Sequence, residues 1–136
     1  MPFYLTQQAQ DFTVGTPLVL ESFFEHSPYG VVFEDDGDTA YFYAVHQENG
    51  ILDALGIYDV QDVADKNIPN EINIIWNEDC TVAALDINGY IHALFDFNRH
   101  AGYCRNAFPE AYGDWLQDDN RLLSDELLDQ YLPDTE

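Results

Sequence analysis

The stretch V-V-F-E-D-D-G-D-T-A-Y-F-Y-A-V, residues 31–45, consists of two apolar runs on either side of a turn. Residues 31–34 and 39–45 are mostly β-branched and aromatic, the types that favour strands. Asp36-Gly37 between them suits the left-handed backbone angles of a two-residue type I′ turn. The stretch therefore predicts a β-hairpin in which Asp35 lies opposite Asp38.

The tip of this hairpin gathers four carboxylates within five residues, Glu34, Asp35, Asp36 and Asp38. Like charges that face each other across strands destabilise a hairpin by roughly 0.2–1 kcal/mol, so local stability does not explain the cluster. It could be a solubilising turn or a docking patch for basic side chains. A cation site is a third alternative, although the cluster lacks the alternating acid spacing of a calcium loop.

A second hairpin is predicted further along the chain. Residues 81–87 and 90–97 are two apolar runs joined by Asn88-Gly89, again a type I′ signal, and a strand over 72–76 precedes them. Apolar residues fill both faces of this hairpin, so it is expected to lie centrally in a sheet that is covered on both sides.

This turn sets the expected register of the second hairpin. With Asn88-Gly89 at its tip, Leu85 lies opposite His92 and Ala83 lies opposite Leu94.

The remaining segments add one strand and two helical stretches. Residues 18–24 form an apolar run between turn signals and predict a strand. Residues 51–58 fit a helical stripe and predict one or two helical turns. Ser124 is a suitable N-cap for a C-terminal helix whose apolar side is Leu127, Leu128 and Tyr131.

The fold class expected from these segments is α+β. It comprises a mainly antiparallel sheet of five or six strands, short helices packed on it and an acidic C-terminal helix. With 136 residues, the chain is expected to form a single domain, 1–136. Its core is predicted at about 12–109, and its acidic helical tail at 110–136.

The composition is strongly acidic. The chain has 26 Asp and Glu against 4 Lys and Arg, a formal net charge of −22, yet 46% of its residues are hydrophobic, as a folded core requires. The N-terminus lacks a signal peptide pattern and no apolar run is long enough to span a membrane, so a cytoplasmic protein without membrane contacts is expected.

This charge restricts the class of partner. Four basic residues are too few to bind nucleic acid through its phosphates, so no direct nucleic acid binding is expected. A negative field instead steers basic proteins toward the surface. The alternative is that the acidity serves only solubility or salt adaptation.

Signatures of catalysis are absent from the sequence. There is no P-loop, G-x-G-x-x-G, G-x-S-x-G or H-E-x-x-H motif, and hence no cofactor or catalytic residue is predicted. Asp96, His100 and Cys104 would line up on one helix face in the order that a cysteine nucleophile uses, but the segment also carries strand and turn signals. The expectation is a protein that is not an enzyme and holds no metal.

Four segments resemble a bacterial family of small acidic proteins classed as a domain of unknown function. They are V-V-F-E-D-D-G-D-T-A-Y-F-Y-A (31–44), I-L-D-A-L-G-I-Y (51–58), I-N-G-Y-I-H-A-L-F-D-F (87–97) and G-Y-C-R-N-A-F-P (102–109). Some small acidic bacterial proteins of this kind occur as immunity proteins against secreted toxins. The resemblance implies no catalytic residue.

The function expected from charge and resemblance is neutralisation of a basic partner protein, most concretely by a toxin immunity protein. The alternatives are a DNA mimic that occupies a DNA-binding protein, and a small enzyme or metal-binding protein. The predicted partner-binding residues combine carboxylates with aromatic anchors, and they are Glu34, Asp35, Asp36, Asp38, Tyr41, Tyr43, Asp114, Trp115, Asp118 and Asp119.

Overall fold

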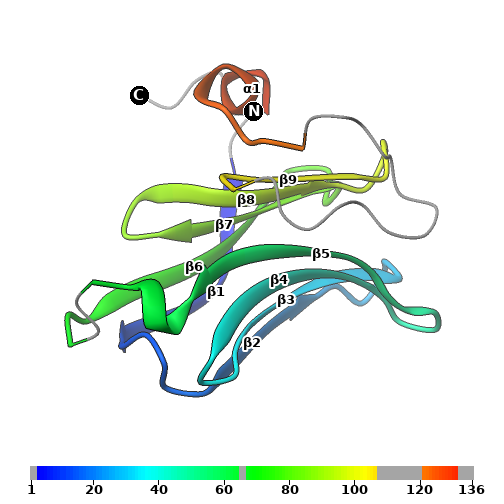
Figure 1. Ribbon diagram of the computed structural model, residues 1–136. Helices are drawn as coiled ribbons and strands as arrows, with labels where there is room; N and C mark the ends of the chain where they lie inside the picture. The colour runs from blue at the N-terminus through cyan, green and yellow to red at the C-terminus, as the bar shows by residue number, and fades with distance from the viewer. Residues whose placement is uncertain (1–2, 65–66, 107–120, 132–136) are drawn as a thin grey trace.

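The protein is described by a computed structural model that covers residues 3–64, 67–106 and 121–131 (Figure 1). Two antiparallel sheets account for nearly all of the secondary structure. The four-stranded sheet has the order β2 (Leu18–Phe23), β3 (Tyr29–Asp35), β4 (Thr39–His46), β5 (Gly50–Asp59). The five-stranded sheet has the order β1 (Phe3–Phe12), β6 (Asn70–Asn77), β7 (Val82–Ile87), β8 (Tyr90–Asp96), β9 (Ala101–Cys104).

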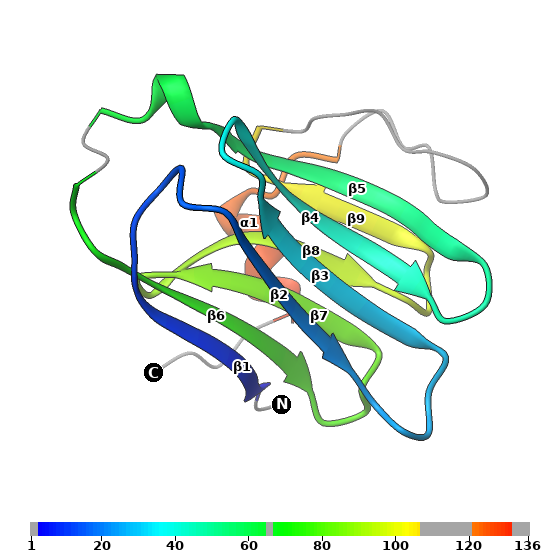
Figure 2. The same ribbon diagram turned by 90° about the horizontal axis from the view of Figure 1, so that it is seen from below.

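The two sheets face each other and enclose the main core (Figures 1 and 2). Alternate residues of β4 point inward, so Ala40, Phe42 and Ala44 are buried while their neighbours are part-exposed. Phe42 stacks on Phe95 of the opposite sheet with ring centroids 5.3 Å apart. These contacts make a β-sandwich whose stability comes from the residues between the sheets.

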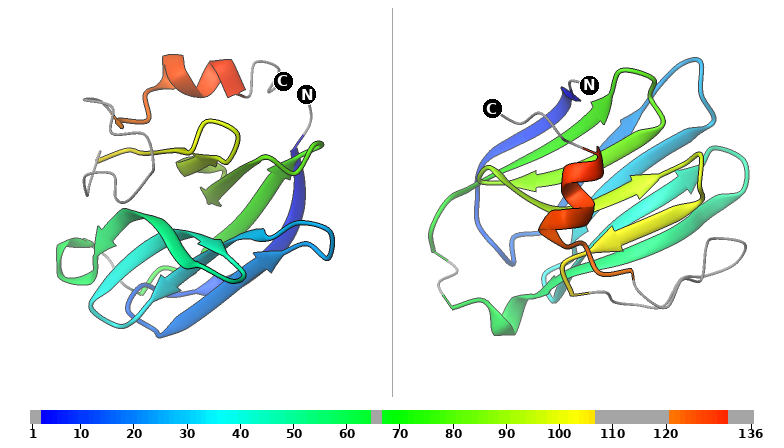
Figure 3. Two further views of the ribbon diagram at one scale, coloured as in Figure 1. Left: turned by 90° about the vertical axis from the view of Figure 1, so that its right-hand side faces the viewer. Right: turned by 90° about the horizontal axis from the view of Figure 1, so that it is seen from above.

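The outer face of the five-stranded sheet is covered by the helix α1 (Asp125–Tyr131; Figure 3). Leu127, Leu128 and Tyr131 pack on a second core cluster that includes Leu94 and Tyr103. The Leu127 backbone N–H donates to the Ser124 hydroxyl at 3.1 Å. The expected N-cap and apolar side of this helix are therefore confirmed, as is the cover on both faces of β7 and β8.

The fold is mainly β, and the expected α+β class with several helices is wrong. The strands form two sheets rather than one, and α1 is the one α-helix in the described parts of the chain. Within the same described parts, one 3₁₀ turn, η1, spans Val60–Asp62. No helix within the described residues is long and apolar enough to cross a membrane.

The segment 51–58, predicted to be helical, lies within strand β5. Its register against β4 shifts twice, between Ala40 and Tyr41 and between Ala44 and Val45, and each shift leaves an extra residue on β5. Such bulges break the alternation of two, which is why the apolar residues of this strand imitate a helical stripe.

The turn of the first hairpin is displaced by one residue from its predicted position. Asp35 pairs with Ala40 rather than Asp38, so the loop residues are Gly37 and Asp38. Of these two, Gly37 has the positive φ, +101°. The displacement moves the register by two residues, which keeps every side chain on its predicted face.

The second hairpin has its predicted turn, and its register differs further along. Asn88 and Gly89 have φ of +57° and +86°, as a type I′ turn requires, and Ile87 pairs with Tyr90. A shift between Leu85 and Asp86 then leaves His92 as the extra residue, so Leu85 pairs with Ala93. The expected pairs of Leu85 with His92 and of Ala83 with Leu94 are therefore wrong, and Ala83 pairs with Phe95 instead.

Two ordered parts of the structure lie outside the predicted core of 12–109: the beginning of β1 and the segment that contains α1. Strand β1 pairs with β6 as an edge strand of the five-stranded sheet, so ordered structure begins well before residue 12. Of the predicted tail 110–136, residues 121–131 are described, and they pack on the sheet.

Candidate functional site

The structure brings part of the predicted partner-binding set together on the outer face of the four-stranded sheet. Glu34, Tyr41 and Tyr43 point to this face, and we call these three residues the tyrosine face. Asp36 and Asp38 lie at the hairpin turn at one end of the same strands. The other predicted contacts, Asp114, Trp115, Asp118 and Asp119, lie outside the described residues.

The tyrosine face is held by the pairing of β3 with β4. Glu34 lies opposite Tyr41, and the rings of Tyr41 and Tyr43 stack at 5.9 Å with an interplanar angle of 17°. Burial, followed by the charge of Glu34, raises the pKa of Tyr43 above its ordinary value. The result is a flat aromatic surface on which the Tyr43 hydroxyl stays protonated beside a carboxylate.

The sheet around the tyrosine face adds apolar surface. Val19 and Phe23 of β2 and Ile51 of β5 point to solvent with 54%, 39% and 50% of their area exposed. Phe23 packs across Gly30, where an added Cβ would lie 2.1 Å from its ring. No described element covers this face, whereas α1 covers the outer face of the other sheet (Figure 3).

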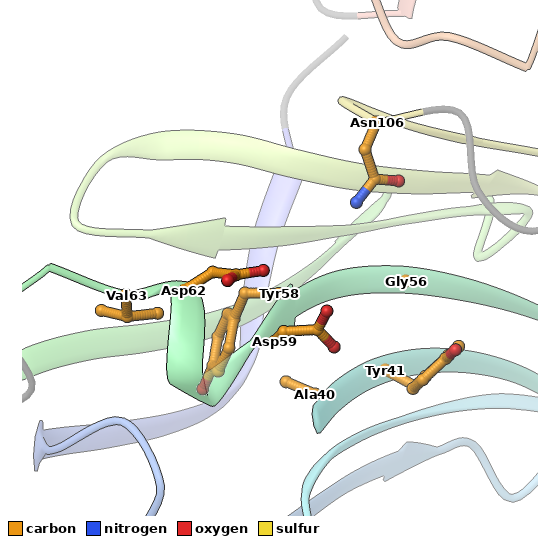
Figure 4. A pocket seen from close by; sticks show the side chains of 8 residues that line it. All are labelled: Ala40, Tyr41, Gly56, Tyr58, Asp59, Asp62, Val63 and Asn106. Atoms are coloured by element: carbon orange, nitrogen blue, oxygen red, sulfur yellow. The ribbon is translucent and has the colours of Figure 1, made fainter. Parts of the chain in front are cut away.

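Carboxylates gather at the end of the tyrosine face where the hairpin turns. A hollow of about 290 Å³ opens beside Tyr41, and Asp59 and Asp62 line it (Figure 4). A second hollow, lined by Asp38 and again by Asp59, adjoins it. We call Asp36, Asp38, Asp59 and Asp62 the acidic rim.

Asp59 and Asp62 were missed by sequence reasoning. Asp59 pairs with Thr39, directly after the hairpin turn, so the pairing of β4 with β5 brings it beside Asp38. A strand prediction for 51–58 would have revealed this neighbour, and the helical interpretation concealed it.

Asp36 belongs to the acidic rim and also shapes the turn. Its Oδ1 accepts the backbone N–H groups of Asp38 and Thr39 at 2.9 and 3.0 Å. The hydrogen bond from Thr39, and then the one from Asp38, lower the pKa of Asp36. The carboxylate therefore stays charged while it stabilises the turn.

Asp35 is not a surface residue, and its inclusion among the partner contacts was wrong. Only 1% of it is exposed. Its carboxylate accepts the backbone N–H groups of Gly15 and Gly37 and the hydroxyl of Tyr58, each at 2.8 Å. Three donors satisfy the oxygens of this buried side chain, so Asp35 has a structural role.

A buried ion pair joins Asp53 of β5 to Arg121, ahead of α1. The Arg121 guanidinium binds the Asp53 carboxylate and also donates to the Gly102 carbonyl at 3.2 Å. Burial raises the pKa of Asp53, and Arg121 opposes that rise. With 0% of Asp53 exposed, the pair ties the C-terminal segment to both sheets and offers no surface to a ligand.

The helical alignment of Asp96, His100 and Cys104 does not exist. Asp96 ends β8, His100 lies in the following turn and Cys104 lies in β9. Cys104 donates its thiol to Asn106 at 3.1 Å, and Asp96 accepts the Tyr131 hydroxyl at 2.9 Å. No group of three or more metal-ligating side chains suited to a metal ion occurs within the described residues.

The comparisons with known proteins agree with the resemblance drawn from the sequence. A family model described as "Uncharacterized protein conserved in bacteria (DUF2251)" matches residues 12–132. An uncharacterized protein of Haemophilus influenzae is 40% identical over 113 residues, which cover 79% of this chain and 68% of that protein. No solved structure matches the chain. The chain therefore belongs to the bacterial DUF2251 family.

Proposed function

We propose that the protein is a non-enzymatic binding protein that neutralises a basic partner protein, most concretely a toxin immunity protein. One observation carries the proposal: stacked, solvent-facing tyrosines lie beside Glu34 on a sheet face that no described element covers and that ends in the acidic rim. Aromatic anchors surrounded by polar residues are the usual composition of a protein interface.

Charge favours a basic partner over a second copy of this chain. Two molecules that each carry −22 repel each other, and the described basic residues offer little to offset that repulsion. Arg105 binds Asp125 at 3.0 Å and Arg121 binds Asp53, so both are already occupied within the fold. A cationic surface placed on the sheet face would instead be attracted by the acidic rim.

A toxin that acts on nucleic acid fits this requirement. Such an enzyme needs a cationic surface for its polyanionic substrate, and an acidic inhibitor that covers this surface would both associate quickly and block the site. In this proposal Tyr41 and Tyr43 supply apolar contact area, while the rim supplies steering and orientation.

The test begins with capture of partners from a lysate of the host bacterium at low and high salt, followed by titration of the captured protein. Replacing Tyr41 and Tyr43 with Ala should weaken binding by about tenfold or more. The matched control is Tyr4→Ala, because Tyr4 is an exposed tyrosine, 52% accessible, on a strand of the other sheet.

A second pair of variants separates the acidic rim from total charge. Asp59→Asn with Asp62→Asn removes the same charge as Glu25→Gln with Glu48→Gln, and the latter two acids are exposed in loops at the opposite end of the strands. Only the rim variant should slow association. Equal losses in both, or capture of nothing but a salt-labile mixture of basic proteins, would support the solubility alternative.

The identity of the captured protein decides between an immunity protein and a DNA mimic. For an immunity protein, the partner should stop cell growth when expressed alone, and co-expression of this chain should restore growth. A DNA-binding partner that releases DNA when this chain is added would support the DNA mimic instead.

A further inference from the structure

A third hollow lies at the end of the sandwich opposite the acidic rim. Strand β3 runs from the turn 24–28 to the turn 36–38, so these turns lie at opposite ends. The loops 78–81 and 97–100 of the other sheet lie beside the first of these turns, and together they line an open hollow of about 670 Å³. Cavities that hold small organic ligands have volumes in this range.

The walls of this hollow are aromatic and its rim is polar. Tyr29 and Phe97 lie at 4.9 Å between ring centroids, and Phe97 stacks in turn on Trp76. Phe24, from the turn before β3, is the third aromatic residue that lines the hollow. The rim carries hydroxyl, amide, imidazole and carboxylate groups from Ser27, Thr81, Asn98, His26, His100 and Asp79.

Side chains that accept backbone N–H groups fix the loops 78–81 and 97–100. Asn77 accepts the N–H groups of Thr81 and Val82 at 2.8 and 3.0 Å. Asp96 accepts those of Asn98 and Arg99 at 3.0 and 3.2 Å. The hollow is therefore preformed, which reduces the entropy that a ligand must overcome on binding.

The loop between β2 and β3 is fixed by hydrogen bonds that its carbonyl groups accept. The side chain of Gln47 donates to the Ser27 carbonyl at 3.2 Å, and the backbone N–H of Gln47 donates to the Pro28 carbonyl at 2.8 Å. In the other two loops, the backbones of Cys80 and His100 have φ of +61° and +53°. Residues other than glycine rarely adopt such positive φ angles. The surrounding structure holds both residues in these conformations.

Charge in this hollow differs from that of the rest of the surface. Two of the four histidines of the chain line it, with Asp79 as its one carboxylate. The hollow beside Tyr41 has two carboxylates in a smaller volume. The rings favour a flat molecule, and the mixed donors and acceptors of the rim favour polar edges rather than a full charge.

We propose that this hollow binds a flat, uncharged heteroaromatic molecule, which packs against Phe24 and Tyr29 with its polar edge toward the rim, while the buried Phe97 supports Tyr29 from behind. The site shares no residue with the tyrosine face or the acidic rim. It is thus independent of the proposed function.

The test uses three probes that share one ring system: uncharged indole, anionic indole-3-acetate and cationic tryptamine. Titrations of the full chain, followed through backbone amide resonances, should show indole shifting residues 24–29, 79–81 and 97–100. Indole-3-acetate should bind more weakly by about tenfold or more, because a chain of net charge −22 repels it. Tryptamine should also perturb the acidic rim.

A matched pair of variants locates the binding. Asn98→Trp should fill the mouth of the hollow and weaken indole binding by about tenfold or more, since Asn98 is exposed and its backbone hydrogen bond to Asp96 is kept. Gln61→Trp, at an exposed residue of the hollow beside Asp38, should leave indole binding unchanged. Absence of shifts in the three loops, equal binding of all three probes, or equal effects of the two variants would overturn the proposal.

Discussion

Tyr58 donates its hydroxyl to the buried carboxylate of Asp35 at 2.8 Å, which joins the edge strand β5 to the end of β3 across β4. The bulge in β5 makes this contact possible, because the register shift places Tyr58 opposite Ala40 on the inner face. Burial, and then Asp35, raise the pKa of Tyr58 well above its ordinary value, so the hydroxyl remains a donor. The carboxylate cluster of the hairpin thus divides into a structural acid, Asp35, and surface acids.

Asp35→Asn should destabilise the fold by about 1–3 kcal/mol. The amide NH₂ group that replaces one carboxylate oxygen cannot accept a hydrogen bond, so at least one of the three donors loses its acceptor. Tyr58→Phe should cost less, about 1 kcal/mol, by removing one of them. Urea denaturation measures both. Asp38→Asn, a change of the same charge at an exposed position nearby, is the control, and a loss of stability there equal to that of Asp35→Asn would contradict this role.

Local chemistry determined the elements that were predicted correctly. Asn88-Gly89 specifies its turn through the left-handed backbone angles that these residues tolerate, and Ser124 caps α1 through its own hydroxyl. Strand β5 was misread because its bulges arise from pairing with β4, a partner that no local window contains. The division into two sheets likewise depends on contacts between distant segments.

The same limit applies to the candidate site. Alternation along β4 sufficed to place Tyr41 and Tyr43 on one face, and adjacency in sequence placed the hairpin acids at its end. Asp59 joins the rim only through strand pairing. The burial of Asp35 depends on donors from Gly15 and Tyr58, which lie 20 and 23 residues away in the sequence.

Arg121→Met should destabilise the protein by about 3–5 kcal/mol, because it leaves the Asp53 carboxylate buried without its guanidinium. Replacing both residues, as Asp53→Leu with Arg121→Met, should cost less than the sum of the single changes, since no lone charge remains. Urea denaturation of the two single variants and the double variant forms the cycle. Strict additivity would show that the pair does not act as a unit.

Stability should fall as the pH drops below the ordinary histidine pKa of 6.5, in part through His92. Burial, followed by the charge of Arg105, lowers the pKa of His92 in the folded state, and Asp86 opposes that shift. The unfolded chain therefore takes up the proton more readily, so the contribution of neutral His92 is complete above pH 6.5 and declines below it.

The measurement for His92 is urea denaturation between about pH 5 and about pH 7.5, on either side of the ordinary histidine pKa. His92→Gln should flatten the dependence on pH over this range. His26→Gln, the same change at a side chain that is 96% exposed, is the control. If both variants kept the slope of the parent, groups other than His92 would control it.

Stability measurements can also separate a binding role of the tyrosine face from a structural one. Tyr41 and Tyr43 point away from the core, so their joint replacement by Ala should cost much less than Phe42→Ala, which empties a fully buried position between them and is expected to cost about 3–5 kcal/mol. Urea denaturation compares the two variants. If the double tyrosine variant lost as much stability as Phe42→Ala, the tyrosines would be part of the fold's own packing, and a loss of partner binding in that variant would no longer identify the contact surface.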